Sequence, residues 1–596
     1  MEATTLVHMF QEVVKNHADR TALMHKVAGS YTGITYNEFA KRVRHLSMGL
    51  ASFGIKPGDR VALMSENRLN WPIVDLAILS IGATDVPLYP TITPPQIKYI
   101  LEDSESRIIF VSKEDLLEKV LVIRDDLPKL EKIIYMDGQF SLKDVISFED
   151  VLIAGEQYDQ KNVGLFERLV DTVKSETLCG IIYTSGTTGN PKGVMLTHDN
   201  ILSNVKAAKS VMNVDSSDLF LSFLPLCHSF ERMAGQFLAI ASGSTIAYAE
   251  NMGTVANNLL EVKPTLVTSV PRLFEKIYSK IIENAQSNSP MKRKIFNWAV
   301  GVGSKYMKAE FRGKISPYLK TQHKIATKLV YNKIKEKVGG RLRFFVSGGA
   351  PLSQQIAEFF YKVGVLILEG YGLTESSPVI SVNRENKFRF GSVGPAIPDV
   401  EIKIEKDGEI LSRGPNIMKG YYKNPDATKE AIDSGGWLHT GDIGFIDEDG
   451  FLFITDRKKN ILVTTGGKNV TPATIENLLI TSPLIEQILV LGDKQKYLTA
   501  LIVPNFDSLK NYAKENNIKF ESIEDLVQNH EIRVRVHKDI KELSANLARF
   551  EQIQKFTLLP KEFTIESGEL TPSLKIKRKV VEQKYADIIN KMYKIN

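Results

Sequence analysis

The stretch GIIYTSGTTGNPKGVMLTHDN, residues 180–200, places threonines, a serine, glycines and a lysine between two apolar runs. The runs LCGIIY and GVMLTH each have the composition of a β-strand, and a helix is predicted to begin only near Asp199. A strand–loop–strand unit of this kind can surround an anion with backbone N–H and hydroxyl donors. The alternative interpretation is a glycine-rich surface turn without a ligand.

This loop differs from the Walker A pattern, GxxxxGK[ST], of other nucleotide-binding proteins. Lys192 is followed by Gly193 instead of a serine or threonine, and Gly189 stands three residues before the lysine. A strand follows the loop, so no helix N-terminus is expected to face the anion. The loop is instead predicted to wrap a polyphosphate with backbone N–H groups and with the hydroxyls of Thr184, Ser185, Thr187 and Thr188.

Length and composition indicate a multidomain globular protein. At 596 residues the chain is too long for one compact core, and 43% hydrophobic with 24% charged residues is ordinary for such proteins. Cys179 and Cys227 are the only cysteines, which excludes a disulfide framework and favours the reducing cytoplasm. The start of the chain, with Glu2, does not resemble a signal peptide, and no apolar run approaches the ~20 residues of a membrane-spanning helix.

One segment carries the excess of positive charge. Residues 289–343 contain fifteen Lys or Arg and two acids, whereas the rest of the chain is net negative. Aromatic residues are spaced through this segment: Phe296, Trp298, Tyr306, Phe311 and Tyr318. A solvated helical insertion with its aromatics toward the core would explain the pattern. The other interpretation is peripheral contact with anionic lipid, on the inner face of a membrane, or with a large phosphorylated ligand.

The order of patterns along the chain predicts an α/β fold with several parts. Strand-like and helical patterns alternate over residues 70–380, which favours largely parallel sheet covered on both faces. We expect a large N-terminal domain over 1–455, with the helical basic insertion at about 286–343 and a β-rich subdomain at about 391–455. The charged DRKKN stretch, 456–460, is a predicted hinge, and 461–596 a smaller, mobile α+β domain.

The motif YTSGTTGNPKG resembles the signature of the adenylate-forming superfamily, which includes acyl-CoA synthetases, luciferases and nonribosomal peptide adenylation domains. Four further motifs resemble those of this superfamily and follow in the required order: SGGAPL (347–352), GYGLTESSP (370–378), WLHTGDIG (437–444) and DRKKNILVTTGGKNVTPATIE (456–476). The resemblance covers nearly the whole chain. It implies that a carboxylate attacks the α-phosphorus of ATP, which gives an acyl-adenylate and pyrophosphate.

The resemblance assigns roles that the side-chain chemistry supports. Tyr371 can stack on adenine, and Asp442 can accept both ribose hydroxyls. Glu375, beside Thr374, supplies a hard oxygen ligand for Mg²⁺, with Thr184 as a second metal-binding candidate. The implied ATP- and AMP-binding residues are Thr184, Ser185, Gly186, Thr187, Thr188, Gly189, Lys192, Gly348, Gly349, Ala350, Gly370, Tyr371, Gly372, Asp442 and Arg457.

Three features resemble the long-chain fatty acyl-CoA synthetase branch: PLCHSFER (225–232), the basic insertion, and LTPSLKIKR (570–578), in which Leu574 replaces the more widespread glycine. This branch implies fatty acid, ATP and CoA as substrates. It makes Lys575 a catalytic residue together with Glu375 and Thr374, and it makes Lys459 the hinge residue. His228 is a candidate gate at the acyl–adenylate junction, or a packed loop histidine. Gly466 and Gly467 could let the pantetheine arm of CoA pass, or form an ordinary tight turn.

Two other functions were weighed against CoA ligation. A fatty acyl-AMP ligase would keep the fold and deliver the adenylate to a carrier protein. A nucleic-acid-binding protein would explain KIKRK (575–579), but the known aromatic-plus-basic recognition motifs are absent, so no nucleic acid is expected. The sequence indicates neither the acyl chain length nor the oligomeric state.

Overall fold

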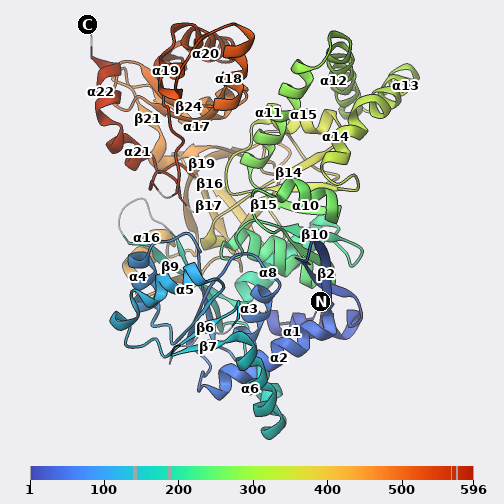
Figure 1. Cartoon of the computed structure of the whole chain (residues 1–596), viewed down its shortest axis with the longest axis vertical. Helices are drawn as coiled ribbons and strands as arrows, with labels where there is room; N and C mark the ends of the chain where they lie inside the picture. Colours follow the sequence, from blue (N-terminus) through green and yellow to red (C-terminus); the bar gives the residue numbers. More distant parts are fainter. Residues whose placement is uncertain are drawn as a thin grey trace.

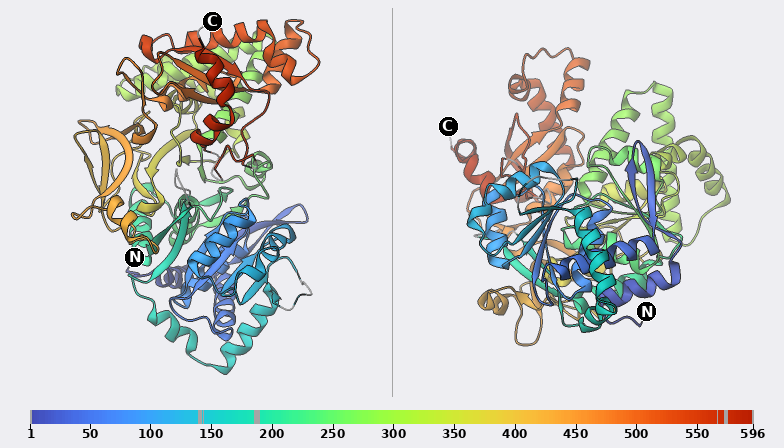
Figure 2. Two further views of the ribbon diagram at one scale, coloured as in Figure 1. Left: turned by 90° about the vertical axis from the view of Figure 1, so that its left-hand side faces the viewer. Right: turned by 60° about the horizontal axis from the view of Figure 1, so that its bottom comes forward.

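The structure, a computed structural model, describes residues 2–138, 142, 144–184, 190–565, 567–571 and 575–594, without the side chains of residues 286 and 287. The predicted α/β class is confirmed, because parallel-rich sheets covered by helices form a large domain and a smaller α+β domain follows. Figure 1 shows the C-terminal domain in orange and red at one end of the large domain. The basic insertion lies at the same end in Figures 1 and 2.

The first large sheet carries three of the predicted site motifs at one edge. Its inner strands run parallel, and an antiparallel strand closes each side. The strands follow the order β15 (Val379–Val382), β14 (Leu366–Gly372), β13 (Phe344–Ser347), β12 (Leu266–Ser269), β10 (Leu219–Ser222), β11 (Thr245–Tyr248), β1 (Thr21–Val27) and β2 (Ser30–Thr35). Strands β12, β13 and β14 are parallel neighbours, so the residues that follow them meet at one edge.

The second large sheet contains the strand–loop–strand unit. Its order is β18 (Gly420–Tyr421), β9 (Lys192–Thr197), β8 (Leu178–Thr184), β4 (Thr84–Leu88), β3 (Arg60–Met64), β5 (Ile108–Val111), β6 (Lys132–Tyr135) and β7 (Val145–Ser147). The two predicted strands of the strand–loop–strand unit are confirmed as β8 and β9, and the structure pairs them antiparallel with Thr184 opposite Lys192. In β3, Val61 and Leu63 enter one core and Ala62 and Met64 another, so both faces of this sheet are buried.

Helices surround the two sheets. Those before the basic insertion are α1 (Leu6–His17), α2 (Tyr36–Ser52), α3 (Asn70–Ser80), α4 (Pro94–Ser104), α5 (Glu114–Leu121), α6 (Phe148–Lys161), α7 (Leu165–Thr172), α8 (His198–Met212), α9 (Leu238–Ala241) and α10 (Val255–Val262). Helix α8 begins where the side chains of Thr197 and Asn200 cap each other's backbone N–H groups. Helix α3 is mostly apolar and is buried on all sides from Trp71 to Ser80, including Asp75.

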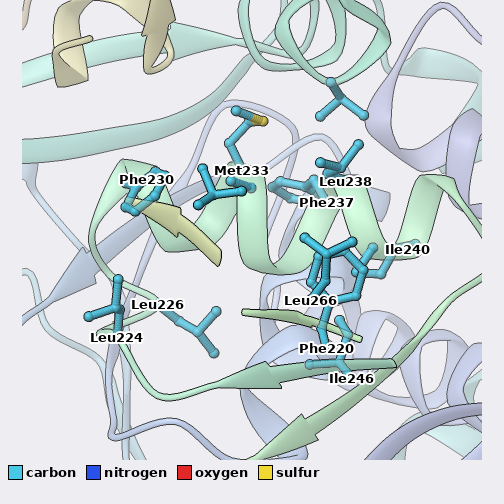
Figure 3. Packing of buried hydrophobic residues seen from close by; sticks show 14 of the residues in the cluster. Phe220, Leu224, Leu226, Phe230, Met233, Phe237, Leu238, Ile240, Ile246 and Leu266 are labelled. Atoms are coloured by element: carbon cyan, nitrogen blue, oxygen red, sulfur yellow. The ribbon is translucent and has the colours of Figure 1, made fainter. Parts of the chain in front are cut away.

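The PLCHSFER segment leads from β10 into the core of the large domain. A π-helix, η2 (Glu231–Phe237), begins within the last two residues of the segment and is buried throughout. Figure 3 shows Phe230 of this segment, with Met233 and Phe237 of η2, packed among buried side chains of β10, β11 and β12. The position of His228 is therefore set by a fixed part of the core.

The β-rich region forms a four-stranded antiparallel sheet. Its order is β16 (Glu401–Ile404), β17 (Glu409–Arg413), β19 (Leu438–Ile446) and β20 (Leu452–Arg457), and helix α16 (Pro425–Ala431) precedes β19. Strand β18 leaves this region and pairs with β9 of the second large sheet. A short 3₁₀ helix, η5 (Lys458–Asn460), follows β20 directly at the predicted hinge.

The basic segment is helical, as predicted. It consists of α12 (Pro290–Phe311), α13 (Pro317–Ala326), a π-helical turn η3 (Thr327–Tyr331) and α14 (Asn332–Lys337), and α11 (Pro271–Ser287) leads into it. Helix α15 (Gln354–Lys362) packs against α12. In Figure 1, α12 and α13 project away from the sheets. None of the helices in the described ranges is long and apolar enough to cross a membrane.

The C-terminal domain has its own core. Strands β23 (Ile485–Leu491), β24 (Leu498–Pro504) and β25 (Ile553–Leu558) form a sheet, and β21 (Leu462–Val463) and β22 (Asn469–Val470) form a hairpin. Ile488 and Val490 face one apolar cluster while Leu489 and Leu491 face another, so both faces of this sheet are covered. The helices are α17 (Pro472–Leu479), α18 (Phe506–Glu515), α19 (Ile523–Gln528), α20 (His530–Leu543), α21 (Arg578–Lys584) and α22 (Ala586–Tyr593).

Candidate active site

The two ends of the polyphosphate loop lie opposite each other in the β8–β9 hairpin. Thr184 is the last residue of β8 and Lys192 the first of β9. The Lys192 ammonium lies 4.9 Å from the centroid of the Tyr421 ring, in cation–π contact. The hairpin thus presents a cation where the loop begins and ends. The predicted loop residues Ser185, Gly186, Thr187, Thr188 and Gly189 lie outside the described residues.

Tyr421 also contacts Glu375, the predicted metal ligand. The Tyr421 hydroxyl donates a hydrogen bond of 2.9 Å to Glu375 Oε1. Burial, and then the Glu375 carboxylate, raise the pKa of Tyr421, so the hydroxyl stays a donor. Sequence reasoning missed Tyr421, which lies 46 residues after Glu375 and reaches it because β18 pairs with β9.

The charged groups Glu375 and Lys192 suit a Mg²⁺ ion that binds together with a polyphosphate. Within the described part of the chain, no group of three or more His, Cys, Asp or Glu residues could hold a metal by itself. Mg²⁺ commonly takes one or two protein carboxylates and completes its shell with phosphate oxygens and water. One half-buried carboxylate, Glu375, beside the cation Lys192 fits that pattern.

Thr374 connects the site to the PLCHSFER segment. Its hydroxyl lies 3.2 Å from that of Ser229. The next residue back, His228, accepts a hydrogen bond of 3.2 Å at Nδ1 from the Phe230 N–H, so its proton resides on Nε2. Burial, and then the Lys575 cation, lower the pKa of His228 to about 4. Neutral His228 can therefore donate one hydrogen bond from Nε2 at physiological pH.

Asp442, the predicted ribose acceptor, is 4% exposed and held from two sides. Tyr371 Oη donates to Asp442 Oδ2 at 2.7 Å, and Arg457 Nε lies 2.9 Å from Oδ1. Burial and the Asp442 charge raise the pKa of Tyr371 well above its usual value. A carboxylate has roughly four acceptor positions, so two remain for a pair of hydroxyls.

The glycines of the adenine motifs have a packing reason of their own. A Cβ at position 372 would lie 1.7 Å from the carbonyl oxygen of Pro378, which no side chain allows. A Cβ on Gly348 would lie 3.0 Å from the Phe230 ring. Gly349 and Ala350 are exposed at the turn after β13, and Gly370 lies in β14. The approach of adenine to this turn stays a prediction.

Lys575 approaches these residues from the C-terminal domain. It precedes α21, and its main-chain N–H donates to Thr571 Oγ1 at 3.0 Å. Loss of water around the ammonium, and then the Arg457 cation, lower the pKa of Lys575, while Asp442 and Glu375 oppose this shift. The residue as a whole remains exposed. The ammonium thus lies within electrostatic range of both carboxylates of the site.

The remaining predicted residues, Lys459, Gly466 and Gly467, lie in η5 and in the β21–β22 hairpin. Lys459 is the middle residue of η5, and its neighbour Lys458 pairs with Asp407 at 2.6 Å and Glu409 at 2.9 Å. Gly466 and Gly467 form an exposed turn in the β21–β22 hairpin, where the Gly467 N–H donates to the carbonyl oxygen of Thr464 at 2.9 Å. In this structure the two glycines form a tight turn, and their contact with CoA stays a prediction.

A two-domain α/β enzyme that binds an adenine nucleotide is the class that this fold and site define. Residues 10–422 match the AMP-binding enzyme family, and residues 459–596 match the AMP-binding enzyme C-terminal domain. The chain therefore belongs to the AMP-binding enzyme family.

Curated relatives match the whole chain. The long-chain-fatty-acid–CoA ligase FadD15 of Mycobacterium bovis is 35% identical over 595 residues, which cover 99% of this chain and 97% of the relative. The peroxisomal long chain acyl-CoA synthetase 6 of Arabidopsis thaliana is also 35% identical, over 100% of this chain and 87% of the relative.

Solved structures share the fold at lower identity. The adenylation domain of a carboxylate reductase from Mycobacterium chelonae has a TM-score of 0.77 at 21% identity, covering 100% of this chain and 92% of that one. ATP-bound MatB from Rhodopseudomonas palustris has a TM-score of 0.69 at 21% identity, covering 98% and 99%.

Proposed function

We propose that this chain is an AMP-forming long-chain fatty acid–CoA ligase, which converts a long-chain fatty acid, ATP and CoA into acyl-CoA, AMP and pyrophosphate. The observation that carries the proposal is that Lys575, from the C-terminal domain, lies within electrostatic range of Arg457, Asp442 and Glu375 of the predicted nucleotide site. Relatives named long-chain-fatty-acid–CoA ligase, 35% identical over nearly the full chain, support the choice of substrates.

The first half-reaction activates the carboxylate. A carboxylate is a poor electrophile because its leaving group would be oxide. Its oxygen instead attacks the α-phosphorus of ATP, the bond to the pyrophosphate oxygen breaks, and an acyl-adenylate forms. Lys575 stabilises the negative charge shared by the carboxylate and the α-phosphate, while Lys192 and the loop hold the β- and γ-phosphates. Mg²⁺, with Glu375 as ligand, would neutralise phosphate charge when bound.

The second half-reaction forms the thioester. The CoA sulfur attacks the acyl carbonyl carbon, the bond to the AMP oxygen breaks, and the thiol proton is lost. Asp442 keeps the nucleotide in place, and the Nε2–H of His228 is a donor at the acyl–adenylate junction. The thiol needs a path to the acyl carbon, so the C-terminal domain turns about Lys459, withdraws Lys575 and brings Gly466 and Gly467 toward CoA.

Two coupled assays test this function. Pyrophosphate release with oleate and ATP, in the absence of CoA, reports the first half-reaction. Conversion of synthetic oleoyl-AMP and CoA to oleoyl-CoA reports the second. Adenylate formation without a thioester would favour the alternative, a fatty acyl-AMP ligase that serves a carrier protein. Absence of both reactions across a series of fatty acid chain lengths would reject the proposal.

We further propose that the basic insertion docks the enzyme on the inner, cytoplasmic face of an anionic membrane, where its substrate is dissolved. None of the fourteen basic side chains from Lys292 to Arg341 forms an ion pair with a carboxylate that the structure describes. Large apolar side chains are exposed among them: Met291, Trp298, Phe311, Tyr318, Ile325 and Leu329. Unpaired cations interleaved with exposed apolar groups favour an anionic lipid surface over a merely solvated face.

Vesicle binding tests this docking surface. Each basic residue near an anionic bilayer contributes roughly 1 kcal/mol, so replacing Lys320, Lys324 and Lys328 with Gln should weaken binding to phosphatidylglycerol–phosphatidylcholine vesicles by ~100-fold. The matched control replaces Lys510, Lys514 and Lys519 of the C-terminal domain with Gln and should bind like the wild type. Binding should also fall steeply with salt. Equal binding to neutral vesicles, or none to anionic ones, would contradict the proposal.

A further inference from the structure

Helix α11 contacts the C-terminal domain directly. It begins with Pro271 after β12. The SGGAPL turn (347–352) lies next to this point, because the Gly348 N–H donates to the carbonyl oxygen of Ser269 at 3.1 Å. Arg272, the second residue of α11, projects from this point toward β23 of the C-terminal domain. A side chain placed here connects the nucleotide side of the large domain with the domain that carries Lys575.

Arg272 binds Glu486 in two ways. Arg272 Nη2 lies 2.5 Å from Glu486 Oε1, and Nη1 donates to the main-chain carbonyl oxygen of Glu486. The Arg272 and Glu486 side chains are only 25% and 15% exposed. A planar guanidinium that donates to a carboxylate and to the carbonyl of the same residue fixes distance and orientation together.

Each domain also holds its own residue of the Arg272–Glu486 pair in place. Within the C-terminal domain, Asn505 Nδ2 donates to Glu486 Oε2 at 3.1 Å. Within α11, Glu275 Oε2 lies 3.3 Å from Arg272 Nη1. About three turns further along α11, Glu283 Oε1 accepts a hydrogen bond of 2.7 Å from Asn511 of α18. Helix α11 therefore contacts the C-terminal domain at two separated points, which defines the orientation of one domain against the other.

One guanidinium is shared between two carboxylates. Burial raises the pKa of Glu275, Arg272 opposes this, and Glu486 adds to the rise. Removing Arg272 would leave Glu275 and Glu486 facing each other, and like charges that face each other repel. Removing the charge of Glu486 would leave Arg272 paired with Glu275. Loss of Arg272 should therefore open the contact more than loss of the Glu486 charge.

We propose that Arg272 and Glu486 form a latch that holds the C-terminal domain in the orientation for adenylate formation, and that they thereby position Lys575. The inference rests on the proposed function, in which this orientation is left before the thioester step. Arg272 and Glu486 are positioning residues, because they act on the reaction through Lys575. The latch must open once per turnover, so it should assist the first half-reaction and not the second.

The test separates the two half-reactions. Arg272→Gln should slow pyrophosphate release with oleate and ATP by ~10-fold, and Glu486→Gln by ~3-fold, because the latter keeps the Arg272–Glu275 pair. Oleoyl-CoA formation from supplied oleoyl-AMP should stay within ~2-fold of the wild type in both variants, which also shows that they are folded. Arg272→Lys should recover part of the loss, since it restores the charge without the two-pronged geometry.

The matched control is Arg413→Gln, which removes an arginine from an exposed pair with Glu401 at 2.9 Å on the β-rich sheet. This control should leave both half-reactions unchanged. Equal losses in both half-reactions, or no loss in either, for Arg272→Gln would overturn the latch.

A second readout does not depend on activity. Trypsin can cut after Arg457, Lys458 and Lys459 at the hinge, and cleavage rates follow the population of open states. Arg272→Gln should be cut there several-fold faster than the wild type and Arg413→Gln should not, and equal rates would overturn the latch. If the wild type makes no acyl-AMP at all, the proposed function fails while this hinge measurement still decides the latch.

Discussion

The two halves of the candidate site are built in contrasting ways. In the large domain, Asp442 is held by Tyr371 and Arg457, and Glu375 is held by Tyr421. Lys575 comes from the C-terminal domain and forms no ion pair with a carboxylate that the structure describes. The nucleotide must stay bound through both half-reactions, whereas a cation at the α-phosphate is needed only in the first. The residues of the large domain therefore suit nucleotide binding, which both half-reactions need. The separate C-terminal domain suits the cation, which only the first half-reaction needs.

The largest expected effect comes from removing the cation of the C-terminal half. Lys575→Ala should slow acyl-AMP formation by ~10²-fold or more, as loss of a key electrostatic group does elsewhere. The same variant should convert supplied oleoyl-AMP and CoA to the thioester at a near-normal rate. Single-turnover assays of each half-reaction measure both values. If the two half-reactions fall together, the division of labour is wrong, and if neither falls, another lysine of KIKRK acts.

The nucleotide-holding residues of the large domain, unlike Lys575, should affect both half-reactions. Asp442→Asn removes the charge that pairs with Arg457 and replaces a charged acceptor for the ribose hydroxyls with a neutral one. Such losses are worth about 1–3 kcal/mol, which corresponds to ~10- to 100-fold in kcat/KM. Both half-reactions should be slowed, because ATP and acyl-AMP share the ribose. A loss confined to one half-reaction would contradict a role for Asp442 in the shared nucleotide site.

A smaller effect, again confined to the first step, is expected at Glu375. Glu375→Gln keeps an acceptor for Tyr421 and loses the charged oxygen offered to Mg²⁺, so adenylation should fall by ~10-fold at low Mg²⁺. Excess Mg²⁺ should restore part of the rate, as a titration of pyrophosphate release against Mg²⁺ would measure. Full activity of the variant at low Mg²⁺ would remove Glu375 from the metal site.

The sequence predicted features that depend on local patterns. The alternation of strand-like and helical patterns was sufficient to predict largely parallel sheet over residues 70–380, and the polarity of residues 184–192 indicated the loop between β8 and β9. Alternation of strands and helices does not determine how strands divide among sheets. The parallel strands form two sheets, one with antiparallel strands at both edges and one with them at a single edge.

Contacts between distant segments had no local signal. Tyr421 reaches Glu375 only because β18 leaves the β-rich region and pairs with β9. Ser229 meets Thr374 across 145 residues, and Arg272 meets Glu486 across 214. The glycines at 348 and 372 were assigned to ATP and AMP binding, and the structure adds close contacts with Phe230 and Pro378 that the sequence did not indicate. Such contacts depend on tertiary packing, which the spacing of motifs does not contain.

The smallest expected effect on activity concerns a buried acid in the core of the large domain. Glu231, in η2, is 0% exposed, and its carboxylate accepts hydrogen bonds from Ser222 Oγ at 2.6 Å and from Thr268 Oγ1. Burial raises the pKa of Glu231 from 4.5 to about 7, although both hydrogen bonds oppose the shift. Glu231 contacts no residue that we place in the reaction, so Glu231→Gln should change either half-reaction by less than ~2-fold.

The stability of the large domain should nevertheless respond to pH through Glu231. A folded-state pKa above the unfolded value gives stability that is fully present below pH 4.5 and is lost as pH rises to about 7. A shift of this size corresponds to ~3 kcal/mol, so Glu231→Gln should gain up to that much relative to the wild type between pH 4.5 and pH 8. Trp71, Trp298 and Trp437 all precede the hinge, so tryptophan fluorescence in urea reports the unfolding of this domain. If the free energies of unfolding of variant and wild type differ by the same amount at both pH values, Glu231 is ionised throughout. This buried position of the large domain would then tolerate a charge.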